Sequence, residues 1–556
     1  MLTYTPPHER DLPQATERPW LLLLLCLVWL LPGLAGREPL KPNETIIADI
    51  VKHMLAGDGF VVPQVAGEPW IQHAPLYYWV ASLFAAALHP LGMAIHSAAR
   101  LATGAFTALA LWGTGMAGRE LIGRRHGRSA VLILVGSVGL LLPGHMLAPD
   151  TAVLAGWSWG LYALTLAPRL SQPAGLILAA AMTLCGLAGS LAEPALLFLL
   201  AVSLYAFPTW RQRRYGATLI LGLFISIPLI AAWPLALSAH APTEFAAWWD
   251  WHALGFLGGF AAPRVFHPFG YYFKLLPWFA WPGWFLAAAT LRMQSDRLAQ
   301  PRFQLPLLAA TLVLICLALS DTRHEGYALL VLPPLALIGA VGLDVLRRGA
   351  SAFLNWFGVM TFGVLTLAGW TGWSAMHLGV PKRLAQRVVE LVPGFQPHLN
   401  IGVTIFGALV TAAWIWAVSR RRPMGRQAVT NWAAGMTAFW CLAVAFAGHW
   451  VDARSAYHDF ALELAPHLPT QGCVASENLY ASQRAVLDYY IGLTTVRRET
   501  EPHLRCEWLL RQGGTEQLSP PPGWLEVWHG GRAGDSSERY YLYRKDAAWT
   551  PPPSSA

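Results

Sequence analysis

Charge is scarce in this chain. Only 13% of its 556 residues are Asp, Glu, Lys or Arg, whereas a soluble protein carries about a quarter. Hydrophobic residues make up 55% of the sequence. So little charge cannot cover a water-exposed surface of this size, so the composition excludes a soluble globular protein. It indicates a polytopic α-helical membrane protein.

Cysteine is also rare, with six residues and no CxxC pair, so nothing indicates a cysteine-ligated structural metal. Four cysteines lie in apolar runs and act as small hydrophobic residues. Cys473 and Cys506 lie in the polar C-terminal region and can form a disulfide if that region faces an oxidising compartment. The sequence alone leaves this pairing open.

The basic residues indicate topology rather than a nucleic-acid partner. The net charge is +8, but the basic residues form short clusters between apolar runs, such as WRQRRY, RMQSDRLAQPR and SRRRPMGR. Cytoplasmic loops of membrane proteins have this pattern. It predicts a cytoplasmic N-terminus, a membrane domain over 1–450 and a soluble domain over 451–556 on the outer side.

The long apolar runs predict about thirteen spanning helices. They are expected near 20–34, 98–116, 130–146, 151–166, 175–191, 195–207, 217–237, 272–291, 305–319, 327–345, 353–376, 401–418 and 431–448. The run at 76–88 is too short to span and Pro90 stops it. We therefore interpret it as an interfacial helix, with Tyr77, Tyr78 and Trp79 as an aromatic belt at the membrane surface.

The first outer loop, 37–96, is too polar to cross a membrane. Residues 43–56 are expected to form an amphipathic helix, with isoleucines on one face and Asp49, Lys52 and His53 on the other. Such a helix lies in the membrane surface with its polar face toward water. This loop is therefore expected to hold charged and polar side chains at the membrane surface, where they can form part of an active site.

Acids near the outer ends of helices are the candidate catalytic groups. Glu44 and Asp49 in the first loop and Asp150 in PGHMLAPDT all fall on the outer side. Paired carboxylates there suit a general base for an acceptor hydroxyl, or a divalent metal at a phosphate leaving group. Helix capping remains an alternative for Asn43 and Asp150, because both residue types are favoured N-caps.

Two further outer segments carry open alternatives. Gln72 and His73 lie near the membrane surface and can be ordinary interfacial polar residues. Arg323, His324 and Glu325 in the loop SDTRHEGY can pair with one another or can grip an anion. The aromatic loop 240–274 can anchor the protein at the interface or act as a gate over a lipid-linked substrate.

The C-terminal region, 451–556, reads as a small α/β domain. Helices are expected at 461–468 and 485–493, a strand at 473–480, and paired strands at 524–530 and 540–545. The last residues, 549–556, are expected to be disordered.

A run of motifs in the first third of the chain resembles glycosyltransferase family 39. These motifs are NETIIADIVKHM at 43–54, GDGFVVPQVAGEPW at 57–70, APLYYW at 74–79, AARL at 98–101 and APDT at 148–151. The family contains lipid A aminoarabinose transferases and protein O-mannosyltransferases. The resemblance implies a GT-C fold in the bacterial inner membrane and sugar transfer from a polyprenyl-phosphate donor to an acceptor at the periplasmic face.

The resemblance also implies site residues. The first-loop acidic pair of the family matches Asn43 and Glu44, and its second acidic motif matches Asp150. The segment that binds the carrier phosphate matches 72–76. In this chain amides stand at Asn43 and Gln72, and His73 stands in place of a lysine. Ile46 replaces an arginine.

The sequence therefore predicts a membrane glycosyltransferase whose partners are a polyprenyl-phosphate sugar, the lipid bilayer and a lipid, glycan or protein acceptor. No cofactor is implied, and metal assistance is left open. A non-catalytic scaffold that presents lipid-linked sugars is the alternative, whereas a transporter is disfavoured because charge inside the spans is nearly absent. The predicted catalytic residues are Asp150, Glu44 and Asn43; the predicted substrate-binding residues are His73, Gln72, Asp49, Tyr77, Arg100, Arg323 and His324.

Overall fold

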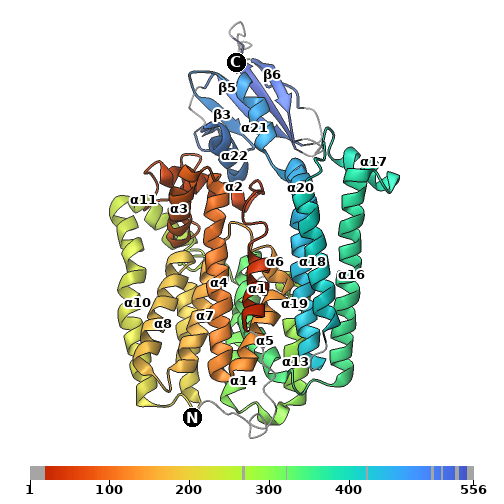
Figure 1. The fold of residues 1–556 in the computed structure, drawn as a ribbon. Helices are drawn as coiled ribbons and strands as arrows, with labels where there is room; N and C mark the ends of the chain where they lie inside the picture. The colour runs from red at the N-terminus through yellow and green to blue at the C-terminus, as the bar shows by residue number, and fades with distance from the viewer. Residues whose placement is uncertain are drawn as a thin grey trace.

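The fold is a tall bundle of helices with a small α/β unit on one end (Figure 1). The computed structural model describes residues 19–265, 270–320, 322–420, 424–501, 506–514, 518–532 and 538–546. The N-terminal segment 1–18, part of the aromatic loop (266–269) and the tail predicted to be disordered lie outside the described residues.

Helices fill the first four fifths of the chain. In chain order they are α1 Pro19–Leu30, α2 Asn43–Leu55, α3 Leu76–Leu88, α4 Ile95–Leu121, α5 Arg124–Val135, α6 Val138–Leu141, α7 Asp150–Leu166, α8 Ser171–Ala188, α9 Ala192–Ser203, α10 Arg213–His240, α11 Pro242–Trp251, α12 Gly270–Phe279, α13 Gly283–Met293, α14 Pro301–Leu319, α15 Leu332–Gly342, α16 Arg348–Leu378, α17 Lys382–Leu391, α18 Ile401–Ser419, α19 Met424–Leu442 and α20 Gly448–Ser455. A 3-10 segment, η6 Glu325–Val331, leads into α15, and a π-helical turn, η7 Ala443–Ala447, joins α19 to α20.

The outer helices of the bundle expose apolar side chains. In α18 only 6% of the most apolar 18-residue window is buried, and Phe224 of α10 is 78% exposed. A surface this apolar is stable against hydrocarbon but not against water. The protein is thus built to span a membrane several times.

The predicted span count of about thirteen remains a prediction. Among the described residues, seven helices are long and apolar enough to cross a membrane, judged by length and composition. Two predicted spans are not single helices: 130–146 divides into α5 and α6, and 272–291 divides into α12 and α13, with Pro282 between them. The interfacial run at 76–88 is α3, which is short, as predicted.

The first outer loop differs from its prediction in what covers α2. Its isoleucine face is buried as expected, but Asp49 on the opposite face is buried too, because a helix of the C-terminal unit, α22 Ala481–Ile491, packs on it (Figure 1). Tyr77 and Tyr78 are 0% and 1% exposed. The predicted aromatic belt is therefore wrong for both tyrosines, which lie in the core.

The described part of the aromatic loop is tied to its neighbours. The backbone N–H of Leu191 donates to the carbonyl of Ala253, and the Ser320 hydroxyl donates to the carbonyl of Phe256. Trp251 in the same loop stays 53% exposed. The gate therefore remains a prediction.

The C-terminal unit agrees with its predicted elements. The described strands are β3 Val474–Glu477, β4 Val496–Arg497, β5 Trp508–Gly513, β6 Trp524–Gly530 and β7 Arg539–Lys545, in the sheet order β4-β3-β5-β7-β6. β3 pairs in parallel with β4 and β5, whereas β7 pairs antiparallel with β5 and β6. α21 His458–Leu464 and α22 complete it. A short hairpin, β1 Gln64–Val65 with β2 Glu68–Pro69, belongs to the first outer loop.

Cys473 and Cys506 form a disulfide in this unit. The remaining four cysteines, Cys26, Cys185, Cys316 and Cys441, are free.

Candidate active site

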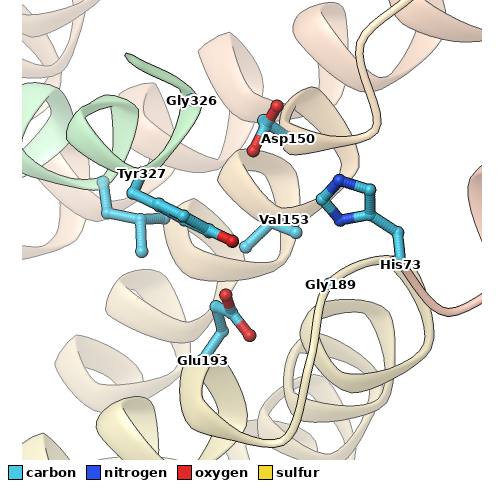
Figure 2. Close-up of a pocket in the computed structure, with 8 residues that line it drawn as sticks. His73, Asp150, Val153, Gly189, Glu193, Gly326 and Tyr327 are labelled. Atoms are coloured by element: carbon cyan, nitrogen blue, oxygen red, sulfur yellow. The ribbon is translucent and has the colours of Figure 1, made fainter. Parts of the chain in front are cut away.

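A pocket lies where four segments that are distant in sequence meet at the end of the bundle near the C-terminal unit. The loop before α3, the start of α7, the α8–α9 connection and η6 form its walls (Figure 2). Its empty volume is about 280 Å³, including the open mouth. The lining residues are His73, Asp150, Val153, Gly189, Glu193, Gly326, Tyr327 and Leu330.

Asp150 is the first residue of α7, where the helix dipole favours a negative charge. Nε2 of His324 lies 3.0 Å from its Oδ2. Burial alone would raise the pKa of Asp150, but the nearby histidines, His324 first and then His73, outweigh burial and lower it. Asp150 is therefore a carboxylate at neutral pH, open to a pocket on one side.

Gly326 makes room for that carboxylate. A Cβ atom at this position would collide with Cγ and both carboxyl oxygens of Asp150. The backbone of η6 thus packs directly against the acid, and only glycine permits this distance.

Two histidines lie beside Asp150 and differ in pKa: His73 lines the pocket, whereas His324 contacts Asp150 but is not among the lining residues. The Asp150 carboxylate raises the pKa of His324 above its usual value, against the effect of burial. Burial is the main effect on His73 and lowers its pKa to about 4, although Asp150 opposes it. Their ring centroids lie 6.4 Å apart. At neutral pH His73 is a neutral hydrogen-bonding group, and His324 is the histidine that more readily carries a proton.

Sequence reasoning missed Glu193 and Tyr327. Figure 2 shows the Tyr327 hydroxyl and the Glu193 carboxylate turned toward the same space as His73 and Asp150. Glu193 Oε2 accepts hydrogen bonds from the Ser190 backbone N–H at 2.8 Å and from its hydroxyl at 2.5 Å. Glu193 lies in the first turn of α9, so the criterion that selected Asp150, an acid at the outer end of a helix, would also have selected Glu193.

Glu44 occupies a separate position outside the pocket lining. It is fully buried and accepts from Arg100 Nε at 2.7 Å and from Arg37 Nη1 at 2.8 Å. The backbone N–H groups of Leu40 and Leu147 also donate to it, at 3.0 and 2.9 Å. Burial raises its pKa, but the two arginines prevail and lower it to about 2.

The predicted catalytic pair of Glu44 and Asp150 stays a prediction, because the described structure places only Asp150 in the pocket lining. The two acids are neighbours through the backbone, because Leu147 lies three residues before Asp150, but Glu44 does not share the pocket. Its oxygens are occupied by arginine and backbone donors.

Arg100 and Tyr77 likewise bind the protein itself. Besides Glu44, Arg100 donates to the carbonyls of Arg37 and Glu38 at 2.7 and 2.9 Å. The Tyr77 hydroxyl accepts from the Ala148 backbone N–H at 3.2 Å and bonds to the Thr103 hydroxyl at 2.6 Å. Neither residue is among the pocket-lining residues, and the Tyr77 contact with Ala148 fixes the segment before Asp150. Their predicted contact with a substrate stays a prediction.

Four other predicted site residues lie outside the pocket lining. Asn43 is exposed at the first position of α2, and no capping hydrogen bond forms at that end of the helix, so the capping alternative is wrong for Asn43. Gln72 and Arg323 are exposed in the loops beside the pocket. Asp49 is fully buried against the C-terminal unit; burial first and Asp488 second raise its pKa to about 8.

Comparison with known proteins finds relatives both by sequence and by structure. No protein-family model matches the chain. An undecaprenyl phosphate-alpha-4-amino-4-deoxy-L-arabinose arabinosyl transferase of Edwardsiella ictaluri is 27% identical over 419 residues, which cover 71% of this chain and 70% of that protein. The enzyme of the same name from Pseudomonas savastanoi is 26% identical over 76% of each chain.

Solved structures match nearly the whole length. The crystal structure of ArnT from Cupriavidus metallidurans in the apo state superposes with a TM-score of 0.65 at 17% identity, covering 94% of this chain and 98% of that chain. The same protein bound to undecaprenyl phosphate superposes equally well, covering 96% and 99%. The chain has the GT-C glycosyltransferase fold. It is a multi-pass bacterial membrane protein, and the predicted fold class is confirmed.

Proposed function

We propose that the chain is a membrane glycosyltransferase that moves a sugar from an undecaprenyl-phosphate-type donor to an envelope acceptor. One observation carries this proposal: Asp150 is an ionised carboxylate, partnered by His324, in a pocket at the end of a bundle with the GT-C fold. The curated relatives are named as transferases of an aminoarabinose carried on undecaprenyl phosphate, which supports the same donor class.

The reaction follows from the pocket groups. An acceptor oxygen attacks the anomeric carbon of the donor sugar, the bond from that carbon to the phosphate oxygen breaks, and polyprenyl phosphate leaves. Asp150 orients the acceptor hydroxyl and takes its proton, a role for which a positioned carboxylate is suited. The leaving phosphate gains negative charge, which a nearby cation stabilises.

His324 is the cation that we assign to the donor phosphate, with neutral His73 as a hydrogen-bonding partner. This reverses the emphasis of the sequence-based expectation, in which His73 was the main phosphate ligand. The lowered pKa of His73 and the raised pKa of His324 support the reversal. Among the described pocket-lining residues there is no lysine or arginine; His73 lines the pocket, and His324 lies next to it through its contact with Asp150.

Glu44, Arg100 and Tyr77 are positioning residues in this proposal. Glu44 and Tyr77 accept from the backbone N–H groups of Leu147 and Ala148, and so hold the chain just before Pro149 and Asp150. Glu44 is itself held by Arg100. Gln72 and Arg323 are exposed and directly precede His73 and His324 in the chain, so we keep them as candidate acceptor contacts; Asn43 is exposed at the start of α2.

We further propose that the pocket and the C-terminal unit face the periplasm and that the N-terminus is cytoplasmic. The disulfide between Cys473 and Cys506 suits an oxidising compartment. α10 begins at Arg213 at the end of the bundle away from the C-terminal unit and reaches α11 near it (Figure 1). Basic residues at that far end fit a cytoplasmic side.

The test is a transfer assay on the purified chain with radiolabelled undecaprenyl-phosphate sugar and membrane extract as the acceptor source. We expect sugar release or transfer by the unmutated protein. In Asp150→Asn the rate of transfer should fall at least a hundredfold, because a general base typically contributes about 10²–10⁴-fold to the rate. Donor binding without turnover in the unmutated protein would instead identify a scaffold and refute the proposal.

A further inference from the structure

A second cluster of chemically active side chains lies outside the pocket, between α2 and α22. Asp49 and His53 are four residues apart and so lie on one face of α2. Asp488 faces them from α22. One ligand atom from each residue, a histidine nitrogen and two carboxylate oxygens, lies within 4.8 Å of the others.

The separations in this cluster are close to those of metal ligands. Nε2 of His53 is 2.8 Å from Oδ2 of Asp488 and 4.0 Å from Oδ2 of Asp49. Ligands of a tetrahedral zinc ion stand about 3.4 Å apart, given metal–ligand distances of about 2.0–2.2 Å. A small rotamer adjustment therefore brings these atoms to the spacing of a metal site.

Burial makes the cluster unusual. Asp49 is fully buried, Asp488 is 3% exposed, and the side chain of His53 is 18% exposed. Within the described residues, Oδ1 of Asp49 is buried without a hydrogen-bond partner, although its Oδ2 accepts from the Ala66 backbone N–H at 2.7 Å. A buried carboxylate oxygen without a partner is costly, so it indicates a missing ligand at this position.

The neighbouring cations do not satisfy the whole cluster. Lys52 donates to Oδ1 of Asp488 at 2.7 Å and to its backbone carbonyl, which leaves Oδ2 toward His53. Arg484, on α22, is paired with Glu68. Lys52 therefore orients the Asp488 carboxylate in the way that a hydrogen-bond donor behind a metal ligand does.

We propose that Asp49, His53 and Asp488 form a binding site for a divalent cation of the zinc class, with water completing its coordination. One imidazole nitrogen and two carboxylate oxygens are a donor set that zinc accepts. On binding, the hydrogen bond between His53 Nε2 and Asp488 Oδ2 is replaced by bonds from both atoms to the cation.

The site would join the C-terminal unit to the membrane domain. Two ligands belong to α2 and the third to α22, so the ion bridges elements about 435 residues apart in sequence. α2 also carries Glu44, whose contact with Leu147 lies next to Asp150. The inference concerns structure and metal content, and it stands whether or not the chain transfers sugar.

The test uses the full-length chain in detergent, stripped with a chelator and then titrated with Zn²⁺. We expect about one tightly held zinc per chain by elemental analysis and a higher melting temperature with zinc than without. His53→Gln keeps the volume and a hydrogen bond to Asp488 but coordinates poorly. It should weaken zinc binding on the order of tenfold or more and abolish the zinc-dependent rise in melting temperature.

Controls separate this site from other histidines. His529→Gln removes the exposed partner of Glu526 on β6, 2.8 Å away, and should leave zinc binding unchanged. Asp488→Asn should behave like His53→Gln. If the unmutated chain binds no zinc beyond His53→Gln, or if Asp150→Asn rather than His53→Gln removes the zinc, the proposed site does not exist.

Discussion

Glu44 is fully buried and Asp150 is half-buried, and the two acids lie beside the same short segment, yet their surroundings differ completely. Glu44 accepts from two arginines and two backbone N–H groups. Asp150 has one histidine partner and a pocket in front of it. An acid whose charge is fully matched is suited to holding structure, whereas an acid that is partly matched and open to a ligand is suited to chemistry. Motif matching alone assigns both acids to catalysis.

The largest effect on stability is expected from Glu44→Gln. This change leaves the Arg37 and Arg100 guanidinium groups buried beside a neutral amide, which typically costs on the order of 3–5 kcal/mol. Thermal unfolding in detergent, followed by tryptophan fluorescence, should show a large fall in the melting temperature. An unchanged melting temperature would mean that the arginine cluster is not structural.

Cys473→Ser tests whether lost stability by itself lowers activity. The disulfide closes 33 residues of the C-terminal unit, and its removal typically costs about 2–4 kcal/mol. Because neither acid is touched, transfer at low temperature should remain close to that of the unmutated chain. Loss of transfer at a temperature where the variant is still folded would contradict the separation of scaffold from chemistry.

Gly326→Ala tests whether the position of the Asp150 carboxylate in the pocket matters for turnover. The added methyl group would displace the Asp150 carboxylate, and a misplacement of about 1 Å can cost on the order of 10²-fold in rate. We expect such a loss in turnover with a modest change in melting temperature. Gly349→Ala is the matched control, because a Cβ there meets no atom within 4 Å.

The smallest effect is a pH dependence set by His324. Its pKa is raised above 6.5, so the positive charge that we assign to binding the donor phosphate is present at lower pH. This charge is lost as the pH rises through the raised pKa. The KM for the donor should therefore rise on the basic side. His324→Lys, which stays protonated there, should remove that basic limb. A basic limb unchanged in His324→Lys would assign it to another group.

The acidic limb comes from Asp150. Its pKa is lowered below the usual 3.8, so the side chain is still mostly ionised at pH 3.8 and becomes protonated only at lower pH. Activity that declines near neutral pH on the acidic side would therefore point away from this carboxylate.

The fold and part of the pocket could be predicted from the sequence. Low charge and apolar runs indicated the membrane bundle, and the outer positions of Asp150, His73 and His324 brought them to one site. The partners of Glu44 could not be predicted, because Arg37 and Arg100 meet it only through tertiary packing. The packing of α22 on α2 could not be predicted either. The polar face that contains Asp49 has the same sequence pattern whether water or another domain lies against it.

Glu193 shows a different limit. Its position in SLAEPAL satisfied the rule that favoured Asp150, but no motif drew attention to it. A helix start is a weak signal by itself, and only the packing of α9 against α7 brings the Glu193 carboxylate into the pocket that Asp150 lines.

The most direct test of the central claim compares Asp150→Asn with Glu44→Gln at a temperature below both melting temperatures. The measured quantity is sugar transfer from undecaprenyl-phosphate donor per folded molecule. We predict at least a hundredfold loss in Asp150→Asn with a near-normal melting temperature, and substantial residual transfer in Glu44→Gln despite its lower stability. Full activity in Asp150→Asn would contradict the account.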